Sequence, residues 1–181
     1  MSRPASPRMT GERLRGVMRH WATGVAVVGA SRLDEELGCE VSSGCTVNAV
    51  TSVSLQPPLV LVCLADTART FATICQSQRF SLSFLTSEQA EAALVFASAA
   101  PEPEKFELVP TVRTEGGPVL EGCLAYLTCR VESMLTAGDH HLVLGEVCGG
   151  ESLEEADPLL FYGGAFWDLM ERPVGDGAGA A

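Results

Sequence analysis

The stretch Gly44–Leu64, GCTVNAVTSVSLQPPLVLVCL, combines two kinds of side-chain chemistry. Its first half places small polar side chains among valine and alanine, namely Thr46, Asn48, Thr51, Ser52 and Ser54. Pro57 and Pro58 then exclude a helix, and the apolar run Leu59–Leu64 is typical of a strand buried on both faces. Hydroxyl and amide groups beside such a strand can hold a polar planar ligand against an apolar wall. A Thr/Ser-rich β-hairpin edge has the same composition, so these residues alone leave both interpretations open.

Outside this stretch, the patterns predict many strands and few helices. Helices are expected at 12–23, from Asp66 or Thr67 to about Gln76, and from Thr86, where Gln89 completes a capping-box spacing, to Phe96. Strands are expected at 25–29, 46–54, 59–64, 80–85, 123–131, 140–147, 158–162 and 165–169. Residues 31–43 are expected to connect two strands of a hairpin, and residues 99–117 to form a loop.

The absence of an alternating β-α pattern favours a mainly β fold, an antiparallel barrel with a few short helices. At 181 residues the chain can bury a sizeable core as one domain. We expect a disordered tail at 1–10, a barrel domain at 11–170 and a mobile low-complexity tail at 171–181. No glycine fingerprint of the form G-x-G-x-x-G follows a strand, so a nicotinamide cofactor would not be held in the Rossmann manner.

The charge distribution argues against nucleic acid as a partner. The net charge is −11, yet the first 20 residues hold five arginines against Glu12, so that segment carries +4 and the remainder −15. Phosphate backbones need clustered lysine and arginine, which this acidic body lacks. Mean hydropathy is high at +0.20, but no apolar run reaches the roughly 20 residues that span a bilayer. We therefore expect no membrane partner. The apolar residues are expected to form a dense core or to be buried in an oligomer interface.

The seven cysteines contain no C-x-x-C pair and are odd in number. Several, such as Cys63 and Cys129, lie inside apolar strand patterns. This distribution is typical of reduced, buried thiols in a cytoplasmic protein, and it predicts neither a disulfide framework nor a zinc site. The adjacent His140 and His141 would point to opposite faces of a strand, and no further ligand stands at useful spacing, so no metal site is expected.

A series of short motifs resembles the flavin reductase family, the small reductase partners of two-component flavin-dependent monooxygenases. In chain order the motifs are T-G-V at 23–25, C-T-V-N-A-V-T-S-V-S-L-Q-P-P-L-V-L-V at 45–62, K-F at 105–106, G-D-H at 138–140, G-E-V at 145–147 and D-P-L-L-F-Y-G-G at 157–164. The S-V-S-x-x-P-P block, within 45–62, and the G-D-H…G-E-V block are each moderately specific, and their order over roughly residues 13–169 makes the resemblance strong. It implies a Greek-key split β-barrel that binds flavin at a homodimer interface.

The resemblance also implies an activity: NAD(P)H-dependent reduction of free flavin, FAD or FMN, with the reduced flavin released to a separate monooxygenase. Hydride transfer from nicotinamide to flavin needs two stacked rings and little acid–base help, so the protein positions the rings and no catalytic side chain is expected. No basic cluster near His140 offers a site for an adenosine 2′-phosphate, which favours NADH over NADPH. A flavin carrier without reductase activity and an enzyme resembling pyridoxamine-phosphate oxidase are the alternatives on the same barrel.

The residues that match the family's binding segments form two groups. The flavin-binding group is Thr46, Val47, Asn48, Ala49, Ser52, Val53, Ser54, Cys63, Leu64, Ala65, Arg69, Thr70, Phe71, Lys105 and Phe106. The nicotinamide-binding group is His140 and Phe166. Within the first group, residues 65–71 match the phosphate segment, and a helix N-terminus there suits an anion.

Several of these positions also have a plain structural interpretation. Arg69 fits a solvated surface charge as well as a phosphate ligand, and Asp66 as a helix cap would compete for the same N–H donors. Lys105 fits a loop salt bridge, and His140 fits a turn residue bonded to its own backbone. Phe166 stands where relatives often have tyrosine, and Cys63 where they often have serine, so a hydroxyl contact is in question at each.

Overall fold

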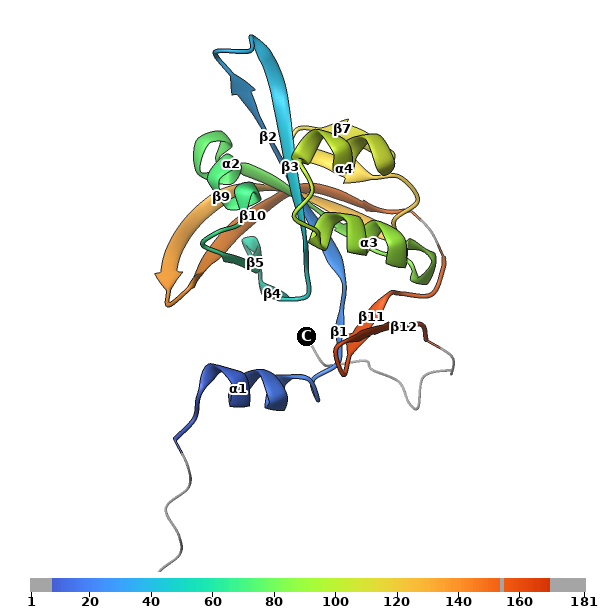
Figure 1. Cartoon of the computed structure of the whole chain (residues 1–181). Helices are drawn as coiled ribbons and strands as arrows, with labels where there is room; N and C mark the ends of the chain where they lie inside the picture. Colours follow the sequence, from blue (N-terminus) through green and yellow to red (C-terminus); the bar gives the residue numbers. More distant parts are fainter. Residues whose placement is uncertain (1–7, 154, 170–181) are drawn as a thin grey trace, which may run out of the picture.

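The largest element of the computed structural model, which describes residues 8–153 and 155–169, is a seven-stranded antiparallel sheet (Figure 1). Its strand order is β3-β2-β6-β9-β10-β5-β4, so β3 and β4 are its edges. The strands are β2 (Ala26–Asp34), β3 (Cys39–Val47), β4 (Val50–Leu55), β5 (Pro58–Ala65), β6 (Arg79–Phe84), β9 (Ala125–Ala137) and β10 (His140–Ser152).

The sheet curls around one apolar core. Val28, Leu82 and Val143 are fully buried in it, and each belongs to a different strand. Val47 from the β3 edge and Val60 from β5, near the other edge, belong to the same buried cluster. Only a strongly twisted and coiled sheet can bring strands from its two ends to one core, which is how a barrel forms. The mainly β fold is thereby confirmed.

The helices lie along one part of this sheet. They are α1 (Gly11–Met18), α2 (Arg69–Ser77), the short 3₁₀ turn η1 (Ser87–Gln89), α3 (Ala90–Ala97) and α4 (Glu102–Leu108). In Figure 1, α2, α3 and α4 flank the β2–β3 ribbon, whereas α1 stands apart from the barrel. None of α1's residues is buried, although it carries leucine, valine and methionine. None of these helices is long and apolar enough to cross a membrane.

Two small sheets complete the architecture. One joins β1 (Thr23–Gly24), β11 (Leu160–Tyr162) and β12 (Ala165–Trp167), and the other pairs β7 (Thr111–Thr114) with β8 (Gly117–Leu120). A second apolar cluster, which includes Phe96 of α3 and Leu120 of β8, lies beneath them. The two predicted C-terminal strands therefore form their own sheet with β1 and are not part of the seven-stranded sheet.

The expected loop at 99–117 is also wrong, because this segment holds α4, β7 and the start of β8. Its prolines suggested irregular backbone, but Pro101 and Pro103 stand at the N-terminus of α4, where a missing N–H costs little, and Pro110 follows the end of the helix. Glu102 and Glu104 in the first turn add favourable interactions with the helix dipole.

Other boundaries differ from the sequence-based expectation. The predicted connection at 31–43 is mostly strand, since β2 and β3 pair from Ala26↔Val47 to Asp34↔Cys39. The single strand expected at 46–54 is two strands, with a break after Val47 and a register shift between Ser52 and Ser54. The first helix ends at Met18 and not at residue 23. The capping box at Thr86 and Gln89 is confirmed.

The domain boundaries stay a prediction. Most of the expected N-terminal tail lies outside the described residues. The expected C-terminal tail lies outside them entirely. The described part of the chain begins just before Thr10, whose side chain accepts a hydrogen bond from the N–H of Arg13 and so caps α1.

Candidate functional site

A groove of about 410 Å³ runs between β3, the start of α2 and the segment that links α3 to α4. We call it the β3 groove. Five of the residues predicted to bind flavin line it, although they are up to 59 positions apart in the chain: Thr46, Ala65, Arg69, Thr70 and Lys105. The fold therefore joins the small-polar stretch, the end of β5, the start of α2 and α4 into one site.

The N-terminus of α2 presents free backbone donors to this groove. The N-cap residue is Ala68, which has no side-chain bond to the helix, so the expectation that Asp66 or Thr67 caps α2 is wrong. Asp66 is exposed, and its N–H donates to the carbonyl of Asp139 at 3.1 Å. With no carboxylate on them, the first N–H groups of a nine-residue helix are available to an anion.

Arg69 stands at the mouth of this anion site with its side chain 59% exposed. Its guanidinium donates to the carbonyl of Ala100 at 3.2 Å and lies 3.9 Å from the Glu102 carboxylate. The first contact is to a neutral group and the second is long, so neither neutralises the arginine fully. Arg69 can therefore add its charge to the helix N-terminus, and its role as a phosphate ligand stays a prediction.

Lys105 has a different environment from the one expected for a loop residue. It lies in α4, and its ammonium group is buried, donating to Glu102 Oε1 at 3.2 Å and to the carbonyl of Gly44 at 3.4 Å. Glu102 also accepts from the N–H of Gly44 at 2.9 Å through its other oxygen. The Lys105–Glu102 pair therefore holds α4 against the edge of β3 and forms a wall of the groove. The positive charge of Lys105 is largely neutralised by Glu102.

The polar side chains of β3 are partly engaged within the chain. The hydroxyl of Thr46 donates to the carbonyl of Ala93 at 2.6 Å, which leaves its lone pairs free to accept. Burial raises the pKa of the Cys45 thiol next to it, with Thr70 as its hydrogen-bond partner. The side chains of Val47 and Leu64 belong to the barrel core, so only their backbone can contact a ligand.

The remaining residues of the small-polar stretch lie at the end of the barrel. Asn48 and Ser52 line a separate cavity of about 610 Å³, together with Trp21 and Val60. Ala49 and Val53 are exposed, and Ser54 accepts a hydrogen bond from the N–H of Gln56 at 3.1 Å. Cys63 is half-buried, and burial raises its pKa. The predicted flavin set is thus divided in a single chain between the β3 groove and this barrel-end cavity.

His140 begins β10 directly opposite Ala65 of the β3 groove. Its Nδ1 lies 2.8 Å from the carboxylate of Asp139, and this hydrogen bond lowers the pKa of Asp139 below its ordinary value. The other ring nitrogen is free of protein contacts among the described residues, and the side chain is 48% exposed. His140 is therefore placed beside the groove with its ring oriented by Asp139.

His141 and Phe71 form a stacked pair that the sequence did not indicate. Their ring centroids lie 3.7 Å apart and their planes are within 5° of parallel, and the Thr136 hydroxyl lies 3.2 Å from Nδ1 of His141. Phe71 was expected to contact flavin, and its side chain is occupied by this stacking. The two adjacent histidines do have different surroundings, as strand alternation predicts.

Two predicted aromatic residues lie away from the β3 groove. Phe166 of β12 packs edge-on against Phe161 at 5.8 Å in the small C-terminal sheet, and Figure 1 shows that sheet far from the tip of β9 and β10, where His140 lies. Phe106 packs edge-on against Phe96 at 5.2 Å. One chain alone does not bring His140 and Phe166 together, and both assignments stay predictions.

Sequence reasoning missed Glu102, which contacts Gly44, Arg69 and Lys105. Its spacing of three residues from Lys105 is an ion-pair spacing on a helix, and this signal was hidden because the segment was interpreted as a loop. It also missed Gly44, where any side chain would collide with Phe96, since an added Cβ would lie 2.7 Å from that ring.

Among the described residues, no three side chains of His, Cys, Asp or Glu gather as metal ligands would.

Comparison with known proteins matches residues 18–170 to the flavin reductase like domain. This chain belongs to the flavin reductase family. An NADH-dependent flavin reductase from a Rhodococcus species is 38% identical over 165 residues, covering 90% of this chain and 89% of the relative. The NADH-dependent FAD reductase of Streptomyces globisporus is 36% identical over 157 residues, covering 84% of this chain and 82% of the relative.

Solved members of the flavin reductase family have the same fold. The NADH:FAD oxidoreductase of Streptomyces globisporus superposes with a TM-score of 0.81 at 32% identity, covering 93% of this chain and all of that one. The flavin reductase component of a bacterial two-component tryptophan halogenase gives 0.80 at 32% identity, covering 90% of this chain and all of that one. The split barrel expected from the motifs is therefore the fold of this chain.

Proposed function

We propose that this protein is an NADH-dependent flavin reductase that supplies reduced flavin to a separate monooxygenase. The reaction moves a hydride from NADH to flavin, and a proton from solvent completes the reduced flavin while NAD⁺ is released. The observation that carries the proposal is the similarity of nearly the whole chain to reductases of this activity. The groove lined by motif residues supports it.

The residues present fit a flavin phosphate at one end of the β3 groove. The uncapped N-terminus of α2 offers backbone N–H donors, and Arg69 stands beside them with an exposed guanidinium. The flavin supplies the redox chemistry when it is bound. The chain's part is to hold the phosphate at α2 and to orient the ring along the small-polar stretch of β3 and β4.

We assign His140 to the nicotinamide side of the reaction. It pairs with Ala65, which lines the groove, and the Asp139 hydrogen bond engages one ring nitrogen and leaves the other without a hydrogen-bond partner among the described residues. A ring fixed in this way can hold a nucleotide in a productive orientation without exchanging a proton with it. The charged side chains next to His140 include the acidic Asp139, which disfavours the extra phosphate of NADPH in its immediate vicinity.

The carrier alternative is separated from the reductase by a turnover measurement. Purified protein, freed of bound flavin, should oxidise NADH only after FAD or FMN is added, and the rate should rise with flavin concentration to a plateau. Oxygen consumption beyond that of free reduced flavin is not expected, because the oxygenase is a separate protein. Binding of flavin without any NADH oxidation, at saturating concentrations of both, would reject the reductase and favour the carrier.

A further inference from the structure

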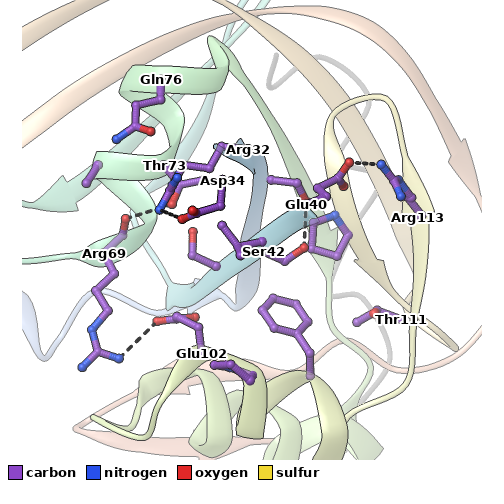
Figure 2. Close-up of a pocket in the computed structure, with 17 residues that line it drawn as sticks. Arg32, Asp34, Glu40, Ser42, Arg69, Thr73, Gln76, Glu102, Thr111 and Arg113 are labelled. Atoms are coloured by element: carbon purple, nitrogen blue, oxygen red, sulfur yellow. Dashed lines mark hydrogen bonds and ion pairs between the residues drawn. The ribbon is translucent and has the colours of Figure 1, made fainter. Parts of the chain in front are cut away.

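Among the described residues that line the β3 groove, Glu102 is the one acidic residue. It begins α4, and its side chain is 14% exposed. It also lines a neighbouring cavity of about 700 Å³, which is the pocket drawn in Figure 2. A carboxylate repels other anions at short range, so Glu102 acts against the binding of a phosphate in the same groove.

The Glu102 carboxylate is shared between two cations and one backbone group. Its Oε1 lies 3.2 Å from the ammonium nitrogen of Lys105 and 3.9 Å from Nη1 of Arg69. Its Oε2 accepts a hydrogen bond from the N–H of Gly44 at 2.9 Å. The three side chains carry two positive charges and one negative charge, so the cluster has a net charge of +1 where the phosphate is expected.

The contacts of Arg69 direct its guanidinium away from the helix on which it stands. Nη1 lies 3.9 Å from the Glu102 carboxylate and donates to the carbonyl of Ala100 at 3.2 Å. Both acceptors belong to the segment that joins α3 to α4, and Figure 2 shows the Arg69 side chain extending from α2 to Glu102. An arginine held in this way has to leave these contacts before it can form a bidentate pair with a phosphate at the start of α2.

We propose that Glu102 is a positioning residue that weakens the binding of the flavin phosphate, because it holds the Arg69 guanidinium on the opposite wall of the groove. The proposal rests on the proposed function, which places the phosphate at α2 and Arg69. A reductase that supplies free reduced flavin has to release it, and affinity differences between variants of one site lie mainly in the dissociation rate. Glu102 therefore favours exchange of flavin over its retention.

Fluorescence titrations with FMN and riboflavin, which differ only in the phosphate, test the proposal. Glu102→Gln should raise the affinity for FMN about tenfold and slow FMN dissociation by a similar factor, with riboflavin affinity unchanged. A disturbance of the groove itself would change the binding of both flavins. Glu104→Gln makes the same charge change at an exposed position in the first turn of α4, outside the groove lining, and should change neither affinity.

The double variant Glu102→Gln/Lys105→Met separates the position of Arg69 from the net charge. It removes one charge of each sign, so it does not leave the buried lysine without a partner and keeps the net charge of the cluster at +1. Only the restraint on Arg69 is lifted, and FMN should bind about threefold more tightly than in the parent, the scale of a partly exposed ion pair. Equal FMN affinity in the double variant and the parent would overturn the positioning role.

Arg69→Gln completes a double-mutant cycle with Glu102→Gln. A free arginine contributes more to phosphate binding than a restrained one, so Arg69→Gln should reduce FMN affinity by a larger factor in the Glu102→Gln background than in the parent. The same factor in both backgrounds would show that Glu102 does not act through Arg69, which also overturns the proposal.

The outcomes are separable from those of the proposed function, because flavin titrations do not depend on turnover. NADH oxidation by the parent protein with FMN tests the reductase alone. If the parent reduces FMN and the Glu102 variants bind FMN as the parent does, the role of Glu102 is rejected and the proposed function stands. If the parent binds FMN without oxidising NADH and the variants bind FMN more tightly, the reductase is rejected and the role of Glu102 stands.

Discussion

His140 and His141 follow one another on β10 but contact different parts of the molecule. His140 bonds to the Asp139 carboxylate and stays half exposed beside Ala65, while His141 stacks on Phe71. Strand alternation alone gives them opposite faces. What it does not give is the partner of each, because Phe71 comes from α2, 70 positions away in the chain. The exposed ring is the one available to a nucleotide, and the stacked ring is a packing element.

We therefore expect His140→Ala to slow reduction of bound flavin by NADH, or to raise the KM for NADH. Losing one positioning contact costs about 1–3 kcal/mol, which is roughly tenfold to a hundredfold in rate. Flavin affinity should stay close to that of the parent, because the proposed flavin contacts lie on β3 and α2. Stopped-flow reduction, beside a flavin titration of the same variant, makes this measurement.

His141→Ala is the matched control for that experiment. It removes the stacking on Phe71 and should lower stability more than turnover. Equal reduction rates for His140→Ala and the parent would exclude His140 from nicotinamide positioning. A loss of flavin binding in His140→Ala would instead place His140 in the flavin site.

The attachment of α4 to β3 depends on one buried ion pair. Lys105 and Glu102 are 5% and 14% exposed, and together they satisfy both backbone groups of Gly44 at the open edge of β3. An edge strand with unpaired backbone groups is prone to bind other chains, so covering it with a helix is also a protection. This pair closes the β3 groove on one side.

Lys105→Met should lower the free energy of unfolding by about 3–5 kcal/mol, because it leaves the Glu102 carboxylate without its buried partner. The double variant Glu102→Gln/Lys105→Met should recover a large part of that loss, since no unpaired charge remains. Urea unfolding of the parent, both single variants and the double variant gives the coupling energy. If the two single losses simply add, Lys105 and Glu102 do not act as a pair.

The sequence motifs predicted the fold and much of the candidate site, because each motif is a short stretch that can be recognised without knowing which distant residues it contacts. The run Leu59–Leu64 is recognisable as a buried strand, and the predicted residues Thr46, Ala65, Arg69 and Thr70 do meet in one groove. The helix at Glu102–Leu108 was missed since its prolines stand in the first turn, where they resemble a loop signal. The stacking of Phe71 on His141 could not be predicted, because it depends on a contact between segments that are distant in the sequence.

Apolar side chains remain uncovered on several surfaces of the single chain, and those near the small-polar stretch form a coherent set. Val53 is 50% exposed, Leu55 77% and Trp21 67%, and Asn48 and Ser52 line the barrel-end cavity beside Trp21. α1 has no buried residue, although its Leu14 and Val17 are apolar. A second copy packed on β4 would bury these groups and would also enclose the part of the predicted flavin set that the β3 groove leaves out.

We expect a homodimer in solution, with sedimentation giving about twice the 19.1 kDa chain mass. Leu55→Asp should dissociate it, because burying an unpaired carboxylate in an apolar interface costs far more than one methyl-sized contact returns. The same variant should lose flavin turnover at low protein concentration, since part of the predicted flavin-binding set, including Asn48 and Ser52, lies at the proposed interface. Leu108→Asp is the matched control: this leucine is 69% exposed on α4, so the charge should change neither mass nor activity. A parent protein that sediments as a monomer at micromolar concentration and still reduces flavin would rule out the interface site, and the flavin would then have to bind within the β3 groove of one chain.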